Sequence, residues 1–182
     1  MRFLPTMLGV LAVTLTTPAY AQDNLGQLTL RGGYAKYYAF DFITGGAEAA
    51  VRVLDNLHVV AGLETYSVNR DLPPDVALIE GQLTKWNTIF PINAGALYKF
   101  QIVDIVEPYA GADLILSQYT DTAWAVGARA RGGLDVMFID NLGANVNLAL
   151  GGWSGQRWEE LQPGLKSAGL LPQISGGIVL AL

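Results

Sequence analysis

The chain has 182 residues and no cysteine, and its 16 acidic side chains outnumber its 11 basic ones to give a net charge of −5. The lack of thiols excludes disulfide bonds and thiolate metal sites, and the negative charge argues against nucleic-acid binding, which requires a basic surface. Of the residues, 51% are hydrophobic. A membrane-spanning helix needs about 18 to 20 consecutive apolar residues, and no stretch after residue 21 is that long. A membrane location would therefore require a closed barrel of strands, because lipid leaves no water to satisfy open backbone edges.

The first 21 residues have the pattern of a secretory signal peptide. Arg2 supplies a positive start, residues 7–13 form a short apolar core, and Ala19-Tyr20-Ala21 provides a small-x-small cleavage site. We predict cleavage of residues 1–21 before Gln22, export from the cytoplasm, and one mature domain over residues 22–182. The mature part would carry 10 basic and 16 acidic side chains, a net charge of −6.

Eight segments of the mature part have the length of barrel strands. Transmembrane strands need about 9 to 11 residues when tilted. The predicted strands are Gln27–Phe40, Gly46–Leu54, Leu57–Arg70, Thr84–Phe100, Pro108–Tyr119, Trp124–Phe138, Leu142–Trp153 and Leu170–Leu182. They predict an all-β fold, an eight-stranded antiparallel up-and-down transmembrane β-barrel.

The connections between these segments alternate in kind. Asp55-Asn56 and Asp140-Asn141 are both followed by Leu, and Asx residues favour the tight turns that join antiparallel strands. The loops predicted at the opposite end are Asp41–Gly45, Asp71–Leu83, Tyr119–Ala123 and Ser154–Gly169. Short turns at one end and longer loops at the other are typical of outer-membrane barrels, in which the turns face the periplasm.

Aromatic residues are sorted toward the ends of the predicted strands. Those at the loop ends are Tyr37, Tyr38, Phe40, Tyr66, Trp86, Tyr119, Trp124 and Trp153, and those at the turn ends are Tyr98, Phe100, Tyr109 and Phe138. Membrane barrels place Trp and Tyr at both interfaces, about 25 Å apart. The pattern therefore predicts two aromatic belts, whereas ordinary core aromatics would show no such sorting.

The segment Trp124–Phe138 alternates charge and hydrophobicity with a period of two. Arg129, Arg131 and Asp135 occupy odd positions, and even positions hold Ala128, Ala130, Leu134, Val136 and Phe138. Since successive side chains of a strand point to opposite faces, one face is apolar and the other carries ions. The same parity in the other segments predicts a set of inward-facing ions, consisting of Arg31, Arg52, Arg129, Arg131, Glu48, Glu64, Asp113 and Asp135.

These ions comprise four of each sign. An isolated buried ion is costly, whereas paired and hydrogen-bonded ions can break even. Eight strands enclose a space just wide enough for side chains. The balance predicts a plugged, charge-paired lumen, in preference to a conducting pore or a solvated sheet face.

Periodicity alone does not distinguish the inside of a barrel from the outside. A small soluble carrier of the lipocalin kind would be polar outside and apolar inside. The aromatic belts, the Ala and Gly residues along the apolar face and the shortage of Lys and Glu favour a wall that faces lipid.

Two motifs resemble the OmpA/OmpX-type small eight-stranded outer-membrane barrels of Gram-negative bacteria, a broad group that includes opacity-like porin-family proteins. Val106–Ala112 is similar to the Pro-Tyr strand start of that group, and Gly127–Asn147 is similar to its Gly-x-Asp and Asp-Asn-Leu-Gly hairpin. The resemblance implies an outer-membrane location. The group usually ends in Phe or Trp, read during assembly, whereas this sequence ends in Leu182.

Nothing in the sequence points to catalysis, a cofactor or a metal. The single histidine, His58, follows the Asp-Asn-Leu turn, at the wrong end for a hydrolase of outer-leaflet lipid. Asp71–Asp75 and Glu159-Glu160 could hold a divalent cation, but acidic loop residues are more often solvated. No glycine pair precedes the Lys-Ser/Thr of a phosphate loop.

We therefore expect a structural or interaction protein of the cell envelope that acts through its two longer loops. Arg157 and Trp158 are the candidate contact residues, because Arg and Trp dominate interface energies. Outer-membrane lipid and lipopolysaccharide are the expected surroundings, with other envelope proteins as possible partners. The alternatives are a narrow pore for small solutes and a barrel subunit of a larger motility, secretion or adhesion assembly.

Overall fold

The computed structural model describes residues 25–37, 40–69, 86–100, 105–118, 124–156 and 168–182. Its strands are β1 (Gly26–Tyr37), β2 (Phe40–Leu54), β3 (Leu57–Asn69), β4 (Trp86–Ile89), β5 (Ile92–Lys99), β6 (Val106–Gln118), β7 (Trp124–Ile139), β8 (Leu142–Gln156) and β9 (Ala168–Ala181). Within these ranges no helix is long and apolar enough to cross a membrane.

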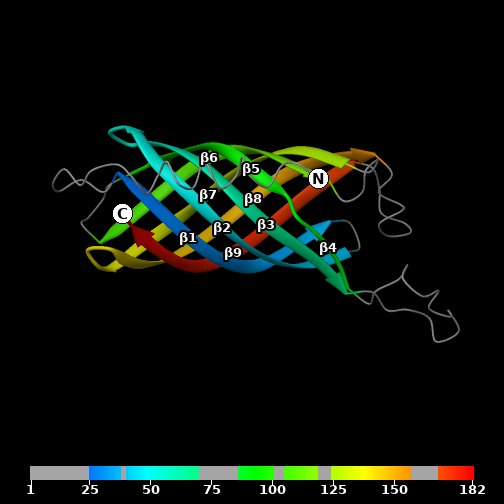
Figure 1. Cartoon of the computed structure of the whole chain (residues 1–182), viewed down its shortest axis with the longest axis horizontal. Helices are drawn as coiled ribbons and strands as arrows, with labels where there is room; N and C mark the ends of the chain where they lie inside the picture. Colours follow the sequence, from blue (N-terminus) through cyan, green and yellow to red (C-terminus); the bar gives the residue numbers. More distant parts are fainter. Residues whose placement is uncertain (1–24, 38–39, 70–85, 101–104, 119–123, 157–167) are drawn as a thin grey trace, which may run out of the picture.

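All strand pairings are antiparallel, and they close into a ring (Figure 1). Apart from β4 and β5, which do not pair with each other, each strand pairs with its neighbours in the chain, and β1 pairs with β9 from Gln27↔Ala181 to Ala35↔Gln173. Both β4 and β5 pair with β3 in one continuous register, so they form a single stave of the wall. The predicted closed barrel of eight antiparallel strands is confirmed.

The fourth stave differs from the single strand predicted over Thr84–Phe100. The strand is interrupted at Phe90 and Pro91. Proline has no N–H to contribute to a ladder, although the Pro91 carbonyl still accepts a hydrogen bond of 2.8 Å from the backbone N–H of Glu64. The missing donor breaks the strand without shifting its register.

The short turns lie together at one end of the barrel, as predicted (Figure 1). Asp55-Asn56 joins β2 to β3, and Asp140-Asn141 joins β7 to β8. Register shifts adjoin both turns, between Arg52 and Leu54 and between Met137 and Ile139. We call this the turn end and the opposite one the loop end.

The loop predicted over Asp41–Gly45 is wrong, because β2 begins at Phe40 and these residues are in the sheet. In the barrel, Gly46 allows two strands to approach closely, since a Cβ there would lie 2.8 Å from the Leu63 carbonyl oxygen. Glycine in a strand often marks such an approach.

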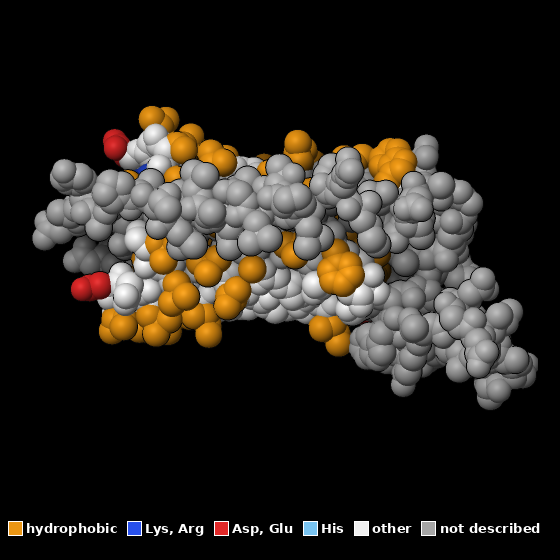
Figure 2. Space-filling view, viewed as in Figure 1, with side chains coloured by type: hydrophobic (Ala, Val, Ile, Leu, Met, Phe, Trp, Pro, Cys, Tyr) orange, Lys and Arg blue, Asp and Glu red, His pale blue; other side chains and the backbone are white. Residues whose placement is uncertain are grey.

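The outer wall carries many exposed hydrophobic side chains, which Figure 2 shows toward both ends of the visible face. Large hydrophobic side chains on it include Leu30, Ile43, Val59, Leu63, Leu114, Leu116, Val126, Val146, Leu148, Leu150, Ile174 and Ile178. Soluble monomers rarely expose so many large hydrophobic side chains, because large apolar patches on them favour association. A wall of this kind is matched to lipid.

The predicted aromatic belts are only partly present. Tyr98, Phe100, Phe138 and Trp124 point outward, each at least 39% exposed. Tyr37, Tyr66, Tyr109 and Trp153 instead point into the barrel, at most 5% exposed. Their alternation along each strand places them on the inner face, so the prediction from strand ends alone was wrong for these four. Tyr38 and Tyr119 lie outside the described residues, as do the side chains of Phe40 and Trp86.

Replacing Leu148 with arginine tests whether the wall faces lipid. Leu148 lies near the middle of β8 and points outward. We expect Leu148→Arg to lower the free energy of unfolding in lipid by about 2 to 4 kcal/mol, the cost of a cation near the bilayer midplane. The outward-facing Ser154, nearer the loop end, is the matched control, and Ser154→Arg should cost at most about 1 kcal/mol. Equal stability of both variants and the parent in a lipid refolding titration would contradict a lipid-facing wall.

Candidate functional site

The inner face of the barrel gathers charged side chains from strands that are far apart in the sequence, β1, β2, β3, β6 and β7. Strand alternation turns the predicted set inward, and seven of its eight members have almost inaccessible side chains. Those seven are Arg31, Glu48, Glu64, Asp113, Arg129, Arg131 and Asp135. The eighth, Arg52, is partly buried near the turn end.

Arg129 is the centre of the middle layer of the lumen. Its Nε donates to Asp113 Oδ1 at 2.8 Å, and its Nη2 donates to Asp113 Oδ2 at 3.0 Å. Its Nη1 donates to Glu64 Oε2 at 2.9 Å, and its Nη2 also pairs with Glu64 Oε1. The guanidinium therefore forms two-pronged contacts with two carboxylates, which is the strongest geometry available to arginine.

Glu48 joins two further arginines to this centre. Its Oε2 lies 2.6 Å from Arg131 Nη1 and 2.5 Å from Arg31 Nη2. Arg131 Nε lies 3.4 Å from Asp113 Oδ2. Three arginines and three carboxylates thus alternate in sign along one connected path across the lumen. We call these six residues, together with Asn93, the ion network; Asn93 Nδ2 lies 3.3 Å from both Glu48 and Asp113.

Glycines make room for these long side chains. A Cβ at Gly151 would lie 2.7 Å from the Cβ of Arg129 on the neighbouring strand β7. Any larger residue there would displace the arginine from its carboxylates. Gly151 therefore serves packing inside the lumen.

A second polar layer lies nearer the turn end and is centred on Lys99, which the sequence analysis missed. Lys99 Nζ lies 2.7 Å from Asp135 Oδ2, 2.9 Å from Glu107 Oε2 and 2.5 Å from Gln27 Oε1. Asp135 therefore pairs with Lys99 and not with an arginine. The inward-facing set predicted from the sequence contains no residue of the fourth segment, in which Asn93 and Lys99 both occupy odd positions on the inner face.

Lys99 and Glu107 change the charge count of the lumen but not its balance. Each sign gains one member beyond the predicted set of four. Taking two ions out of water costs several kcal/mol per ion, and only close pairing with further hydrogen bonds offsets that cost. The contacts of Arg129 and Lys99 meet this requirement.

His58 is buried and faces Arg52 across the β2–β3 hairpin, at the turn end where the sequence placed it. Within the described parts of the chain, no three His, Cys, Asp or Glu residues are grouped so as to hold a metal ion. The acidic segments Asp71–Asp75 and Glu159-Glu160 lie outside the described residues, as do Arg157 and Trp158.

A closed ring of eight antiparallel strands with an apolar wall and an ion-paired interior is the architecture of a small transmembrane β-barrel. The crystal structure of Neisserial surface protein A is similar, with a TM-score of 0.56 and 16% identity over 86% of this chain and 96% of that one. A de novo designed transmembrane β-barrel also matches, with a TM-score of 0.50 and 16% identity over 90% of this chain and 100% of that one. At such identities the likeness shows the fold alone.

No protein family model matches the sequence, and a search of curated proteins also gave no match. The fold expected from the resemblance to small outer-membrane barrels is confirmed by the structure.

Removing Arg129 tests the ion network. Arg129→Met leaves Glu64 and Asp113 buried without their main counter-ion, so we expect the free energy of unfolding to fall by about 3 to 5 kcal/mol. Adding Glu64→Gln to that variant should restore part of the loss. As a matched control, Lys36 pairs with Asp41 at 3.8 Å on the exposed surface, and Lys36→Met should cost less than about 1 kcal/mol. Equal losses for Lys36 and Arg129, measured by denaturant titration, would refute the network's contribution.

Proposed function

We propose that this chain is a bacterial outer-membrane protein whose barrel is a closed, non-conducting anchor, and that it acts as a structural or interaction component of the cell envelope through its loops. The observation that carries the proposal is the unbroken path of alternating charges from Arg31 through Arg129 to Glu64.

The ion network favours a closed lumen for a physical reason. Conduction requires sites that bind an ion weakly enough to release it, along a continuous polar path. Here the carboxylates are already paired with arginines, and Asp113 and Arg129 are at most 4% exposed. A permeating ion would have to break several buried pairs at once.

The outer-membrane location is supported by two independent features. Residues 1–21 have the pattern of a signal peptide, and the wall of the barrel is apolar where strands such as β8 and β9 face outward. The barrel to which this one is similar is described as a surface protein in Neisseria, which agrees with the same compartment.

A catalytic role for the barrel finds no support. His58 lies at the turn end, and the carboxylates of the ion network are engaged with arginines. We therefore place the protein's interactions on the loops, where Arg157 and Trp158 remain the proposed contact residues. Lipopolysaccharide and other envelope proteins are the partners that this position favours, including those of a larger motility, secretion or adhesion assembly.

Planar-bilayer recording tests the closed lumen. We expect the folded parent protein to insert without steady conductance, because paired side chains fill the lumen. A steady conductance of the parent that is abolished by Arg129→Met or Glu48→Gln would refute the proposal and favour the narrow pore. Insertion is verified separately by protease protection of the reconstituted protein.

Cross-linking in intact cells tests the loop contacts. A photo-reactive residue at position 158 should capture envelope components, and Trp158→Ala should reduce co-purification of the captured partner without lowering barrel stability. Trp124→Ala is the matched control, since Trp124 points outward from β7 into the predicted lipid region. Undiminished co-purification with Trp158→Ala would count against this contact.

A further inference from the structure

A cluster of buried hydrophobic side chains fills the loop end of the lumen. It consists of Ala35, Tyr37, Phe42, Tyr66, Ile89, Ile115, Ala125, Trp153 and Leu171, each at most 2% exposed. These residues come from β1, β2, β3, β4, β6, β7, β8 and β9, so every one of the eight staves contributes. We call this cluster the aromatic cap. A cluster with members from the whole ring extends across the lumen and does not merely line one side.

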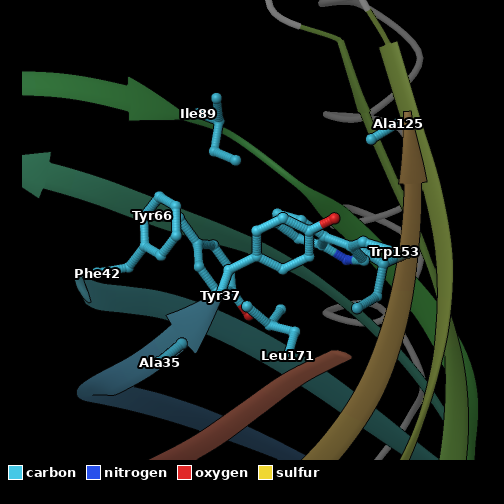
Figure 3. Packing of buried hydrophobic residues seen from close by; sticks show 9 residues of the cluster. Ala35, Tyr37, Phe42, Tyr66, Ile89, Ala125, Trp153 and Leu171 are labelled. Atoms are coloured by element: carbon cyan, nitrogen blue, oxygen red, sulfur yellow. The ribbon is translucent and has the colours of Figure 1, made fainter. Parts of the chain in front are cut away.

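The aromatic rings of the cap form a continuous row of contacts. The centroids of Tyr66 and Trp153 are 5.2 Å apart, those of Phe42 and Tyr66 are 6.0 Å apart, and those of Tyr37 and Trp153 are 6.3 Å apart. These are normal distances for tilted and edge-on aromatic pairs. Figure 3 shows the side chains pointing into one shared space from strands on different sides of the barrel.

Tyr66 joins the cap to the ion network below it. Its hydroxyl donates to Glu64 Oε2 at 2.8 Å, and it lies 3.0 Å from Gln173 Oε1. Arg129 Nη1 lies 3.3 Å from the same hydroxyl. The ring of Tyr66 therefore belongs to the apolar layer while its oxygen belongs to the charged one.

The ion network by itself is suited to hold water. Among the described residues, Arg131 Nη2 and Asn93 Oδ1 of this network have no hydrogen-bond partner although both are buried. A buried polar atom left without a partner costs about 1 to 3 kcal/mol, and water is the usual partner inside proteins. A layer with such atoms attracts water and is a poor barrier to it.

The cap is more apolar than the ion network. Its nine members are aromatic or aliphatic, with the hydroxyls and ring N–H of Tyr37, Tyr66 and Trp153 as their only polar side-chain groups. Two buried hydroxyls without a hydrogen-bond partner in the described part of the chain, those of Thr44 and Ser117, lie at the same level, opposite Tyr66 and Ala125. Narrow hydrophobic constrictions exclude water and ions by dewetting. The two layers therefore have different roles. The ion network fixes the side chains in the middle of the lumen, and the cap excludes solvent at the loop end.

We propose that the aromatic cap is the solvent seal of the lumen, and that Trp153 is the side chain on which the seal chiefly depends. This inference rests on the proposed function, since a seal has a purpose only in a barrel that is meant to stay closed. It assigns the exclusion of water to the cap, whereas the ion network obstructs a permeating ion.

A single buried thiol can report on the seal, because the chain has no cysteine of its own. Ser175 is suitable, since it lies on the inner face of β9 below Leu171 and Gln173 and accepts a hydrogen bond of 3.3 Å from Asn147 Nδ2. Ser175→Cys is nearly isosteric. The probe is a small charged methanethiosulfonate, and its rate of reaction is measured on the folded protein. The Lys99 layer stays intact in every variant, so a change in rate reports on the loop end.

We expect the thiol of Ser175→Cys to react with the methanethiosulfonate more slowly in the folded protein than in the unfolded chain. Adding Trp153→Ala should raise its reaction rate by about tenfold or more, because the vacated volume admits water. Trp124→Ala is the control, because Trp124 also lies at the loop end but points outward from β7. This substitution should leave the reaction rate unchanged. Tyr66→Phe keeps the ring but removes the bonds to Glu64 and Gln173, and it should also leave the thiol protected.

Three results would overturn the seal: a parent thiol that reacts as fast as in the unfolded chain, a thiol that stays protected in Trp153→Ala, or equal exposure in Tyr66→Phe. Folding of each variant is checked by resistance to SDS at room temperature. If Trp153→Ala does not fold, Leu171→Ala opens the cap by a smaller cavity and is expected to raise the rate in the same direction. A conducting parent in the planar bilayer refutes the proposed function, whereas a closed parent with an unresponsive thiol refutes only the cap.

Discussion

The closure of the sheet between β1 and β9 is the constraint on which the other features depend. In lipid, an open strand edge would leave backbone N–H and C=O groups without partners, at a cost of several kcal/mol each. Pairing the first strand with the last removes both edges. Closure also gives the sheet an inside, and since side chains alternate along every strand, half of them must fit into the narrow space of eight strands.

That narrow interior explains why its side chains are arranged in layers. Large apolar residues fill the loop end around Tyr66 and Trp153, arginine pairs with carboxylates in the middle, and Lys99 pairs with Asp135 nearer the turn end. Each layer is compatible with burial in its own way. Rings need only contact, whereas ions need partners at hydrogen-bond distance. Glycines such as Gly151 make the space in which the arginines reach those partners.

The sequence predicted the fold and most of the inner face because a period of two is a local property of the chain. Arg129, Arg131 and Asp135 are assigned to one face by their positions alone. The prediction of the aromatic belts used only the distance of a residue from the strand end and not its odd or even position. It was therefore wrong for Tyr37, Tyr66 and Trp153, which point into the barrel. Lys99 is absent from the predicted set because it lies in the fourth segment, whose strand is interrupted at Pro91 and is the least regular of the eight.

By itself, then, the sequence determined the fold class, the number of staves, the end at which the turns lie and the sign balance of the buried ions, all of which follow from spacing along the chain. Only the tertiary structure decided which ions meet. Asp135 and Arg131 are neighbours on one face of β7, yet Asp135 pairs with Lys99 and Arg131 with Glu48. Partner choice depends on the register between strands and on the width of the lumen, which bring together residues as far apart as Glu64 and Arg129.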